Sequence, residues 1–350
     1  MTRHIVLGQL MPVTWPALEG FARALSTFCS VHVAPNRVIS SHVGPGNIEI
    51  TWRARRASLR LDAGSEAGLQ NLRDTLGHLL EEVEEGLSAR LDWQAEGNLE
   101  GRLPPNFRSA RVSRVTRLSR GFMRLRLEAE DLGYLAQNGL HLRLLQPTDP
   151  DAPVWPRLNR NGRTVWPGAS DLHMPVYTIR AIDPAQGWLD VDVFLHGHGR
   201  TCAWALQVRA GARVGLTGPG GGWLPRTPTL WLGGDETALP AVARILHEAS
   251  PDTQGHAMLT VSDAANILPL DAPPGVQVEW LVQGRDAASR DEVTAHLTRS
   301  AARCLTQAAT ATIQFAGEKS VAQAIRASLQ RITGKLPANV TCAAYWTRTA

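Results

Sequence analysis

The sequence predicts a multidomain chain of mixed α+β and α/β class, in which a small α/β domain precedes an antiparallel β-barrel and a doubly wound parallel α/β domain. The length of 350 residues exceeds what one hydrophobic core normally supports. The middle of the chain is rich in short, evenly spaced strand patterns, which are typical of a barrel. The last third alternates strand and helix patterns, as parallel sheets do. We expect domains over residues 1–103, 106–226 and 227–350.

The first domain combines helix and strand patterns. Leucines recur at helical spacing from Glu66 to about Ala89, which predicts a long helix. The pair Pro104-Pro105 is typical of a linker. The other expected elements are a helix over Leu18–Phe28, strands over Asn47–Trp52 and Ala57–Leu61, and a short strand that begins at Asp92-Trp93.

The N-terminal segment carries two features of a signal peptide, Arg3 and an apolar stretch, but Gln9 and Pro12 interrupt that stretch. We therefore expect it to belong to the folded protein.

The four cysteines are scattered and form no CxxC pair, which argues against zinc-ribbon and iron–sulfur sites and fits a reducing compartment. Both observations favour a cytoplasmic location.

The formal net charge of +4 is small for this length and is spread along the chain. Lys and Arg do not cluster with aromatic residues, so nucleic-acid binding is not expected. A mildly basic surface favours acidic small molecules. No stretch approaches the roughly 18 consecutive apolar residues of a transmembrane helix, so no stable membrane insertion is expected.

Turn residues such as Gly121, Gly187 and Gly211 separate the strand patterns of the second domain. The segment Pro150–Pro167 is a long insertion in this domain, and loops of that length are often functional. The expected strands are Ser109–Arg117, Phe122–Glu128, His141–Leu145, Val176–Ile182, Leu189–Phe194 and Arg213–Thr217.

The third domain begins with a strand over Thr229–Leu232 and a helix over Leu239–Ala249. In such a sheet, the carboxyl end of the first strand is where a nucleotide binds. The remaining expected elements are strands over His256–Val261, Gln277–Leu281, Ala311–Phe315 and Asn339–Tyr345, and helices over Ser289–Ala302 and Val321–Arg331.

One barrel strand carries the sequence VYTIR, Val176 to Arg180. An aromatic ring beside a hydroxyl group suits a flavin, because Tyr177 would stack on the ring system and Thr178 would hydrogen-bond to its N5 atom. Taken alone, a Tyr-Thr pair on a strand is mostly core packing.

In HGHGRTCAWAL, His196 to Leu206, a glycine-rich turn leads into a helix with Thr201 and Cys202 in its first turn. The N–H groups at a helix start attract a phosphate. Taken alone, the pattern is also that of an ordinary helix with a Thr N-cap. His196 and His198 resemble a metal pair, but no carboxylate accompanies them and we expect no metal site.

Two glycine clusters follow. GPGGGW, Gly218 to Trp223, permits a path with positive φ, although it is equally the pattern of a simple turn. WLGGDETALPAVARIL, Trp231 to Leu246, ends a strand in Gly-Gly and starts a helix near Ala238. It is not GxGxxG, so the usual dinucleotide fingerprint is absent. Asp235 and Glu236 would repel a pyrophosphate unless they point elsewhere or cap the helix.

The last motif is QFAGEKSVAQAIRASL, Gln314 to Leu329, in which a strand ends and a helix follows. Glu318 would cap this helix. Lys319, Arg326 and Lys335 would present positive charge near the cleft between the two domains. The plainer interpretation of these cations is a solvated basic face.

In order and content these motifs resemble the siderophore-interacting protein family, FAD-containing ferric-siderophore reductases related to ferredoxin–NADP reductases. The resemblance covers about Phe107 to Trp346. GDETALPA, Gly234 to Ala241, is similar to the family's hallmark in its nicotinamide domain. YTIR, the His-Gly turn and GPGG resemble its flavin barrel, and AGE with the terminal Tyr345-Trp346 resembles its end. The first block resembles a small uncharacterised α/β domain found with these reductases.

The resemblance implies a flavin-binding barrel and a nicotinamide-binding α/β domain, with FAD as cofactor and NADPH or NADH as co-substrate. It implies a ferric siderophore as the small-molecule partner, for which Lys319, Arg326 and Lys335 are candidate contacts. Tyr177 and Thr178 are the implied catalytic pair. The implied cofactor-binding residues are Tyr177, Thr178, Ile179, Arg180, His196, Gly199, Thr201, Cys202, Gly234, Asp235, Glu236 and Thr237.

One position departs from the family's pattern. The flavin motif usually has Arg two residues before the Tyr, where this chain has Pro175. A charge-assisted contact to a flavin phosphate contributes about 1.5–3 kcal/mol, so FAD would bind roughly ten- to a hundredfold more weakly. The arginines that would compensate are Arg180, Arg200 and, in the insertion, Arg157, Arg160 and Arg163.

The expected function is an NAD(P)H-dependent ferric-siderophore reductase, in which hydride passes to FAD and single electrons then pass to siderophore-bound Fe(III), releasing Fe(II) for iron acquisition. There are two alternatives. One is a reductase of the same build with another acceptor, such as free flavin or a partner protein. The other is a non-catalytic siderophore-binding module that has lost its flavin because of Pro175.

Overall fold

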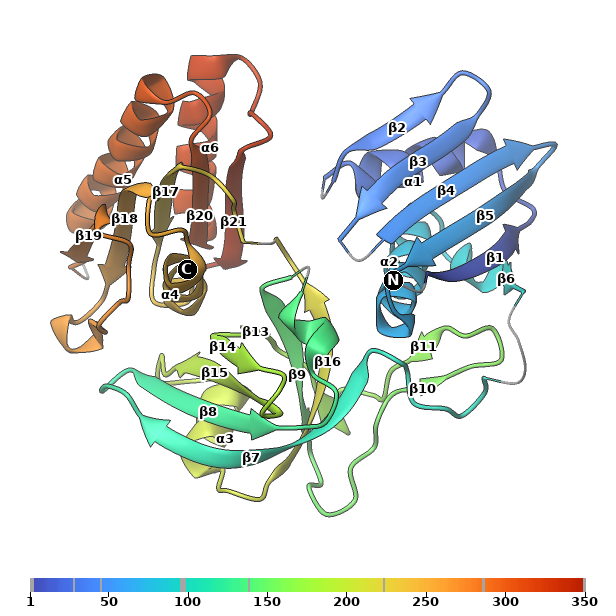
Figure 1. Ribbon diagram of the computed structural model, residues 1–350, viewed down its shortest axis with the longest axis horizontal. Coiled ribbons are helices and arrows are strands. Elements are labelled where there is room, and N and C mark those ends of the chain that lie inside the picture. Colours follow the sequence, from blue (N-terminus) through green and yellow to red (C-terminus); the bar gives the residue numbers. More distant parts are fainter. Residues whose placement is uncertain are drawn as a thin grey trace.

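The computed structural model describes residues 3–27, 29–44, 46–94, 99–137, 139–222, 224–284 and 287–348. Figure 1 shows the N-terminal block (blue) and the C-terminal domain (orange to red) resting on a central barrel (green to yellow). Each part has its own main sheet. We propose residues 1–103, 106–226 and 227–350 as the limits of the three domains. Among the described residues, no helix is both long and apolar enough to cross a membrane.

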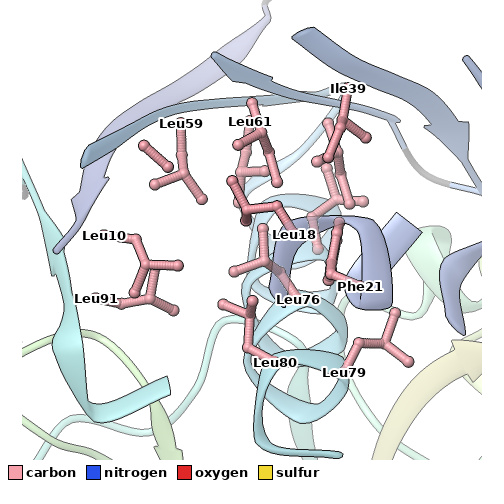
Figure 2. Close-up of a cluster of buried hydrophobic side chains, with 14 of the residues drawn as sticks. Leu10, Leu18, Phe21, Ile39, Leu59, Leu61, Leu76, Leu79, Leu80 and Leu91 are labelled. Atoms are coloured by element: carbon pink, nitrogen blue, oxygen red, sulfur yellow. The ribbon is translucent and has the colours of Figure 1, made fainter. Parts of the chain in front are cut away.

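The N-terminal block is a six-stranded antiparallel sheet, in the order β2-β3-β4-β5-β1-β6, with helices α1 and α2 packed on one face. Each helix begins at a polar N-cap: Thr14 accepts from Ala17 N at 3.3 Å, and Ser65 accepts from Gly68 N at 3.0 Å. Figure 2 shows leucines of both helices meeting sheet side chains such as Leu59 in one core. The elements are β1 His4–Leu10, α1 Trp15–Leu25, β2 Val31–Ala34, β3 Val38–Val43, β4 Gly46–Arg53, β5 Arg56–Ala63, α2 Glu66–Val83, the 3-10 helix η1 Ser88–Arg90 and β6 Leu91–Trp93.

Three strands of this block, β1 to β3, are absent from the elements expected from the sequence. The long helix also ends earlier than expected, at Val83 rather than near Ala89. The cause is Gly86, which has φ +77° and donates its N–H to Glu81 Oε1 at 2.8 Å, so that the chain turns out of the helix. The first helix starts at Trp15, and Phe28, its expected end, lies outside the described residues.

The barrel sheet is antiparallel, in the order β12-β9-β16-β7-β8-β15-β14, and β13 also pairs with β9. The strand expected over Val176–Ile182 is two short strands, because the chain changes partner between them: Ile179 N donates to Leu140 O and Arg180 N to Asp190 O, both at 2.8 Å. This crossing brings the two ends of the sheet together. The elements are β7 Phe107–Arg117, β8 Phe122–Glu128, η2 Gly133–Ala136, β9 His141–Pro147, β12 Leu172–His173, β13 Val176–Thr178, β14 Ala181–Asp183, β15 Trp188–Phe194, α3 Arg200–Gln207 and β16 Arg213–Gly220.

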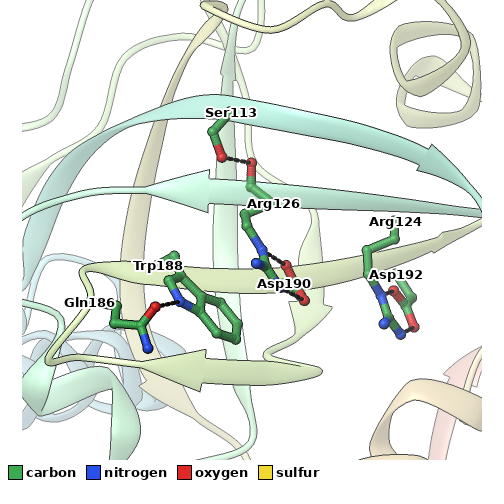
Figure 3. Close-up of polar contacts among 7 residues, drawn as sticks. All are labelled: Ser113, Arg124, Arg126, Gln186, Trp188, Asp190 and Asp192. Carbon is green, nitrogen blue, oxygen red and sulfur yellow. Dashed lines mark hydrogen bonds and ion pairs between the residues drawn. The ribbon is translucent and has the colours of Figure 1, made fainter.

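Two arginine–aspartate pairs join β8 to β15, where the register places the partners directly opposite each other (Figure 3). Arg124 Nε lies 2.7 Å from Asp192 Oδ1, Arg126 Nε lies 2.8 Å from Asp190 Oδ1, and each pair has a second contact of 2.8 Å. The Arg126 guanidinium also lies 3.8 Å from the centre of the Trp188 ring. Two-point pairing compensates the charges of the two buried carboxylates.

The insertion between β9 and β12 forms a small hairpin of β10 (Arg157–Leu158) and β11 (Thr164–Val165), which lies beside the N-terminal block (Figure 1). Asn161 Nδ2 donates to Leu91 O at 3.3 Å, and Arg163 Nη1 donates to Ser88 Oγ at 2.7 Å. The insertion therefore joins the barrel to the N-terminal block.

The C-terminal domain is a parallel five-stranded sheet in the order β19-β18-β17-β20-β21, with a buried hydrophobic cluster on each face. The first strand, β17, lies at the centre of the sheet between β18 and β20, so the strand order reverses at its carboxyl end. The elements are β17 Thr229–Gly234, α4 Leu239–Glu248, β18 Gln254–Val261, η3 Ala264–Asn266, β19 Gly275–Val282, α5 Ala287–Gln307, β20 Thr312–Glu318, α6 Lys319–Thr333 and β21 Val340–Trp346.

Candidate functional site

A cavity of about 590 Å³ lies between the barrel and the parallel domain. The barrel contributes β13 and β15, and the parallel domain contributes the turn from β17 into α4 and the ends of β20 and β21. Of the residues selected from the sequence, Tyr177, Thr178, His196, Glu236 and Thr237 line this cavity. We call it the interdomain cleft.

Tyr177 and Thr178 lie on opposite faces of β13. Tyr177 pairs with Leu142 of β9 and packs against the barrel core, with part of its ring in the cleft, whereas Thr178 pairs with His141 and is 5% exposed. Burial raises the pKa of Tyr177 to about 12, and a hydrogen bond with the Thr201 side chain opposes this shift. The aromatic ring is therefore held at the cleft edge as a neutral phenol.

Gly199 begins helix α3 with φ +90°, a conformation that favours glycine, and no side chain caps the helix there. The Thr201 hydroxyl lies 3.0 Å from His173 Nε2, and the Cys202 thiol donates to Phe194 O at 3.4 Å. The three residues expected at a phosphate, Gly199, Thr201 and Cys202, thus lie together behind Tyr177 and outside the cleft lining. His173 was missed by the sequence analysis because a lone histidine carries no pattern.

His196 lines the cleft and lies against His198, with their Nδ1 atoms 2.9 Å apart and their rings edge to face. Burial and the neighbouring imidazole of His198 both lower the pKa of His196. Within the described ranges, no three His, Cys, Asp or Glu side chains gather as metal ligands would.

Ile179 and Arg180 follow the Tyr-Thr pair and leave the cleft. Ile179 is fully buried in the barrel core, and its carbonyl accepts from Arg244 Nη1 at 2.9 Å. Burial lowers the pKa of Arg180, although Asp192, 3.9 Å from its Nε atom, opposes this shift. Neither side chain is brought to the cleft, so contact with a cofactor there would be indirect.

Asp235, the first carboxylate of the turn after β17, accepts hydrogen bonds from protein groups. Asp235 accepts from Thr237 N at 2.9 Å, from Glu318 N at 3.0 Å and from Trp346 Nε1 at 2.7 Å. Burial raises the pKa of Asp235 despite these donors. A Cβ atom at Gly234 would lie 2.5 Å from Ala238 Cβ, which explains the small residue before the turn.

The second carboxylate of this turn is also occupied. Glu236 Oε1 accepts from Ser262 N at 2.5 Å and from Ser262 Oγ at 2.6 Å, and Asn266 Nδ2 lies 3.5 Å away. The repulsion expected between a pyrophosphate and these two acids is thus reduced, because both carboxylates bind protein donors. Thr237 is left facing the cleft.

Two cleft residues from distant parts of the chain were not selected as site residues from the sequence. Tyr345 of β21 has its hydroxyl 2.9 Å from His141 Nε2 of β9, and the two rings meet edge to face. Trp346 follows and holds Asp235. The terminal Tyr-Trp pair had only been noted as part of the family resemblance. In the structure it connects the parallel domain to the barrel across the cleft.

The three cations expected near the cleft lie elsewhere. Lys319, Arg326 and Lys335 are exposed on and after α6, and none lines the cleft. Burial raises the pKa of the Cys342 thiol to about 11, and Arg326 opposes this shift from nearby. Of the glycine cluster that closes the barrel, Gly221 and Gly222 line the cleft, and Trp223 lies outside the described residues.

Acid is expected to weaken the contact between the two domains at His141. Burial lowers the pKa of this imidazole, nearby Arg244 acts in the same direction, and a hydrogen bond with the Gly220 backbone opposes both. The stability contributed by neutral His141 is therefore present above the unfolded pKa of about 6.5 and is lost as the pH falls through the lower folded value. Thermal melts between pH 8 and pH 5 (roughly the range of His titration) should show a smaller acid loss for His141→Gln than for the wild type. His32→Gln, at an exposed position, should leave the loss unchanged.

Comparisons with known proteins match both domains that form the cleft. The family model described as "Siderophore-interacting FAD-binding domain" matches residues 111–223, and the model described as "Siderophore-interacting protein" matches residues 227–349. The barrel is therefore an FAD-binding domain of the siderophore-interacting type. The residues before 111, including the N-terminal block, lie outside both matched ranges.

Two curated relatives carry reductase names. The chain is 30% identical over 179 residues to ferric vibriobactin reductase ViuB of Vibrio cholerae, covering 49% of this chain and 65% of that protein. It therefore spans just under two thirds of the length of that relative. It is 31% identical over 192 residues to the NADPH-dependent ferric-chelate reductase of Escherichia coli K12, covering 52% of this chain and 73% of that protein.

Among solved structures, a siderophore utilization protein from T. fusca is 28% identical, with a TM-score of 0.58 over 71% of this chain and 96% of that one. The siderophore-interacting protein SipS from Aeromonas hydrophila, 23% identical with a TM-score of 0.54 over 69% of this chain and 99% of that one, shares the fold. With both domain models and these relatives in agreement, the chain belongs to the siderophore-interacting protein family.

Proposed function

We propose that the protein is an NAD(P)H-dependent ferric-siderophore reductase. The observation that carries the proposal is the interdomain cleft, where Tyr177 of the FAD-binding barrel and Thr237 of the parallel domain lie on facing walls. A cleft at the switch point of a parallel sheet is where a nucleotide cofactor is expected. The reductase names of the two curated relatives support the choice of acceptor.

The residues present fit FAD. The ring of Tyr177 is held at the cleft edge by burial and by Thr201, in the manner of a stacking platform. The uncapped turn at Gly199 offers backbone N–H groups to a phosphate. At Gly221, which has φ +76°, a Cβ atom would lie 2.4 Å from His141 Nδ1, so this turn follows the cleft wall closely only because it is glycine. We propose that these three features hold the ring, the phosphates and the ring edge, respectively.

When bound, FAD would supply N5 as the hydride acceptor and would pass the electrons one at a time to siderophore-bound Fe(III). In the proposed reaction one NAD(P)H reduces two siderophore-bound Fe(III) ions to Fe(II) and releases one proton. The protein has to position the flavin ring and the nicotinamide and to exclude water. Thr178, almost fully buried beside Tyr177, would orient the ring edge, and Thr237 would face the nicotinamide. No protein acid or base is needed for hydride transfer.

The remaining site residues and the location stay proposals. Lys319, Arg326 and Lys335 stay proposed contacts of an anionic siderophore as it approaches over the exposed surface of the parallel domain, since none of them lines the interdomain cleft. Gly234 and Asp235 are proposed to shape the nicotinamide site from behind the cleft wall, and Glu236 from its lining. We also propose that the protein acts in the cytoplasm. NADPH and NADH are both proposed co-substrates.

Pro175 is proposed to weaken FAD binding, because four of the five arginines expected to compensate have partners in the protein: Arg180 lies 3.9 Å from Asp192, and the other three are bonded as follows. Arg200 donates to Ala169 O at 3.0 Å, Arg157 to Gly101 O at 3.2 Å and Arg163 to Ser88 Oγ at 2.7 Å. Arg200 is closest in sequence to the α3 turn, so it is the one that a phosphate would recruit most easily.

The decisive test is an anaerobic visible titration of the FAD-loaded protein. The flavin band should bleach on addition of NADPH or NADH and return on addition of a ferric siderophore. Tyr177→Ala should raise the Kd for FAD by about tenfold or more, because the stacking surface is lost. Tyr134→Phe, which removes only a hydroxyl bonded to Asn106 O away from the cleft, is the matched control.

Two other outcomes would replace the proposal. If the band bleaches but recovers with free flavin and not with ferric siderophore, the protein is a reductase with another acceptor. If FAD does not bind, or bound FAD never bleaches, the protein is a binding module rather than an enzyme.

A further inference from the structure

A second cavity, of about 540 Å³, adjoins the interdomain cleft at the barrel strand that carries Tyr177. One of its walls is helix α2 of the N-terminal block, which faces the barrel across it. The second cavity shares His141, Val176 and Gly221 with the interdomain cleft, so the two adjoin at the residue directly before Tyr177. The N-terminal block, which neither family model covers, therefore contributes to the surroundings of the flavin site.

A buried polar network fixes α2 in this position. Asp74 Oδ1 accepts from Gln70 Nε2 at 2.9 Å, and Asp74 Oδ2 accepts from Thr164 Oγ1 of the insertion hairpin at 3.0 Å. Asn106, in the segment that leads into the barrel, places its Nδ2 atom 3.4 Å from the same carboxylate. Burying a carboxylate costs free energy unless hydrogen-bond donors surround it. Since the donors to Asp74 come from three segments, the network favours one orientation of the N-terminal block on the barrel.

The same helix reaches the glycine cluster beside the flavin site. Asn71 Nδ2 donates to Gly218 O at 2.9 Å, and Asn71 Oδ1 accepts from Asn106 Nδ2 at 2.6 Å. Gly218 has φ +146° and begins the turn that runs to Gly221 at the junction of the two cavities. Helix α2 is thus attached to a turn that borders both.

The lining combines apolar surface with one cation, Arg143. Val176 is 57% exposed, unusual for a valine on a barrel strand, and Trp166 of the insertion and Met174, which follows β12, lie in the same cavity. Arg143 lies opposite Val176 in the β9–β13 register, and its guanidinium has no hydrogen-bond or ion-pair partner among the described residues. His78 of α2 completes the wall. Such a lining suits a bulky ligand that has aromatic groups and a net negative charge.

We propose that the second cavity receives the electron acceptor, an anionic aromatic metal chelate, and that helix α2 of the N-terminal block limits which chelates enter. This inference rests on the proposed reductase function. The nicotinamide has to approach from the parallel domain, through the interdomain cleft. An acceptor in the second cavity reaches the flavin from the side of the N-terminal block, past Val176, so donor and acceptor do not compete for space.

The test fills the cavity from the α2 side. Thr75→Trp introduces a large side chain at a lining position whose hydroxyl makes no hydrogen bond among the described residues, and Glu19→Trp makes the same change on the exposed face of α1 as a control. The probe is the trianionic gallium(III) complex of a tricatecholate, which matches the charge and shape of the ferric complex and accepts no electron. Its binding to the FAD-loaded protein is measured by calorimetry.

We expect Thr75→Trp to weaken binding of the gallium complex by about tenfold or more, while Glu19→Trp binds like the wild type. FAD affinity and bleaching by NAD(P)H should be unchanged in both variants. His78→Trp, at an exposed position of the same wall, should act in the same direction and serves if Thr75→Trp does not fold.

Equal binding of the gallium complex by the wild type, Thr75→Trp and His78→Trp would overturn the inference, whatever the flavin does. Weaker FAD binding in these variants would also overturn it, because the cavity would then belong to FAD itself. Failure of the wild type to bleach with NAD(P)H counts instead against the proposed reductase function, so the two failures are distinct.

Discussion

Replacing Asp235 by alanine is expected to lower the free energy of unfolding by about 3 kcal/mol, the largest loss of any single change proposed for this chain. Asp235 lies at the end of the central strand β17 and accepts from the backbone of Thr237, the backbone of Glu318 and the indole of Trp346. Alanine would leave the two backbone donors unpaired inside the protein, and each such group costs about 1–3 kcal/mol.

Urea melts of the apoprotein measure this loss. Asp149→Ala is the matched control, because Asp149 also accepts from two backbone N–H groups, at 2.9 and 3.2 Å, but in an exposed turn. It should cost no more than about 1 kcal/mol, since water replaces the carboxylate there. Equal losses for the two variants would mean that Asp235 is not the anchor of the β17 turn and that Trp346 and Glu318 are held by other contacts.

Replacing Arg244 by methionine is expected to cost about 2–3 kcal/mol and to slow bleaching of the flavin by NAD(P)H about tenfold. Arg244 is 1% exposed, yet its guanidinium donates to Ile179 O at 2.9 Å and to Glu248 Oε1 at 3.0 Å. The first bond runs from helix α4 of the parallel domain to the backbone next to Tyr177 and Thr178. Methionine fills much of the same volume but leaves the Ile179 carbonyl without this donor.

Stopped-flow bleaching and urea melts test the two parts of this prediction. Arg244→Lys keeps the charge and one donor, so it should recover part of both losses. Arg331→Met, on the exposed side of α6, controls for loss of a positive charge. If Arg244→Met loses stability but bleaches at the wild-type rate, the bond to Ile179 holds the fold together without positioning the flavin strand.

Regular elements with a strong local pattern could be predicted from the sequence. Strand β8, Phe122–Glu128, has the expected bounds, and α4 begins at Leu239 as expected, because Pro240 in its first turn marks a helix start. Strand β2 was missed because it is only four residues long, and β3 because two serines and a histidine interrupt its apolar pattern. The strand over Val176–Ile182 was expected to be continuous, because nothing local indicates that it changes partner at Ile179.

Part of the site could be predicted by family resemblance. The contacts that could not be predicted join residues that are far apart in the sequence. Tyr177 and Thr237 carry motifs and do face the cleft. His141 and Tyr345, which meet across it, are 204 positions apart, and no local pattern relates them. The side chains of Asp235 and Glu236 are oriented by donors from other strands. From the sequence their charges predicted repulsion of a pyrophosphate, and the tertiary structure reduces this repulsion. No local sequence pattern predicts that α2 forms a wall of the second cavity, since this depends on how the N-terminal block packs against the barrel.

The central strand β17 finds both of its neighbours later in the chain: β18 after α4, and β20 after β19 and α5. Strands β4 and β5, by contrast, join through a tight turn at Ala54 and Arg55, with φ +48° and +65°. Because contacts between distant segments require loop closure before they gain any energy, the hairpins of the N-terminal block form early and the parallel sheet forms late. A chain caught midway through folding is therefore expected to hold the hairpins of β2 to β5 and yet to have no cleft, since Asp235 and Tyr345 come together only when the parallel sheet closes.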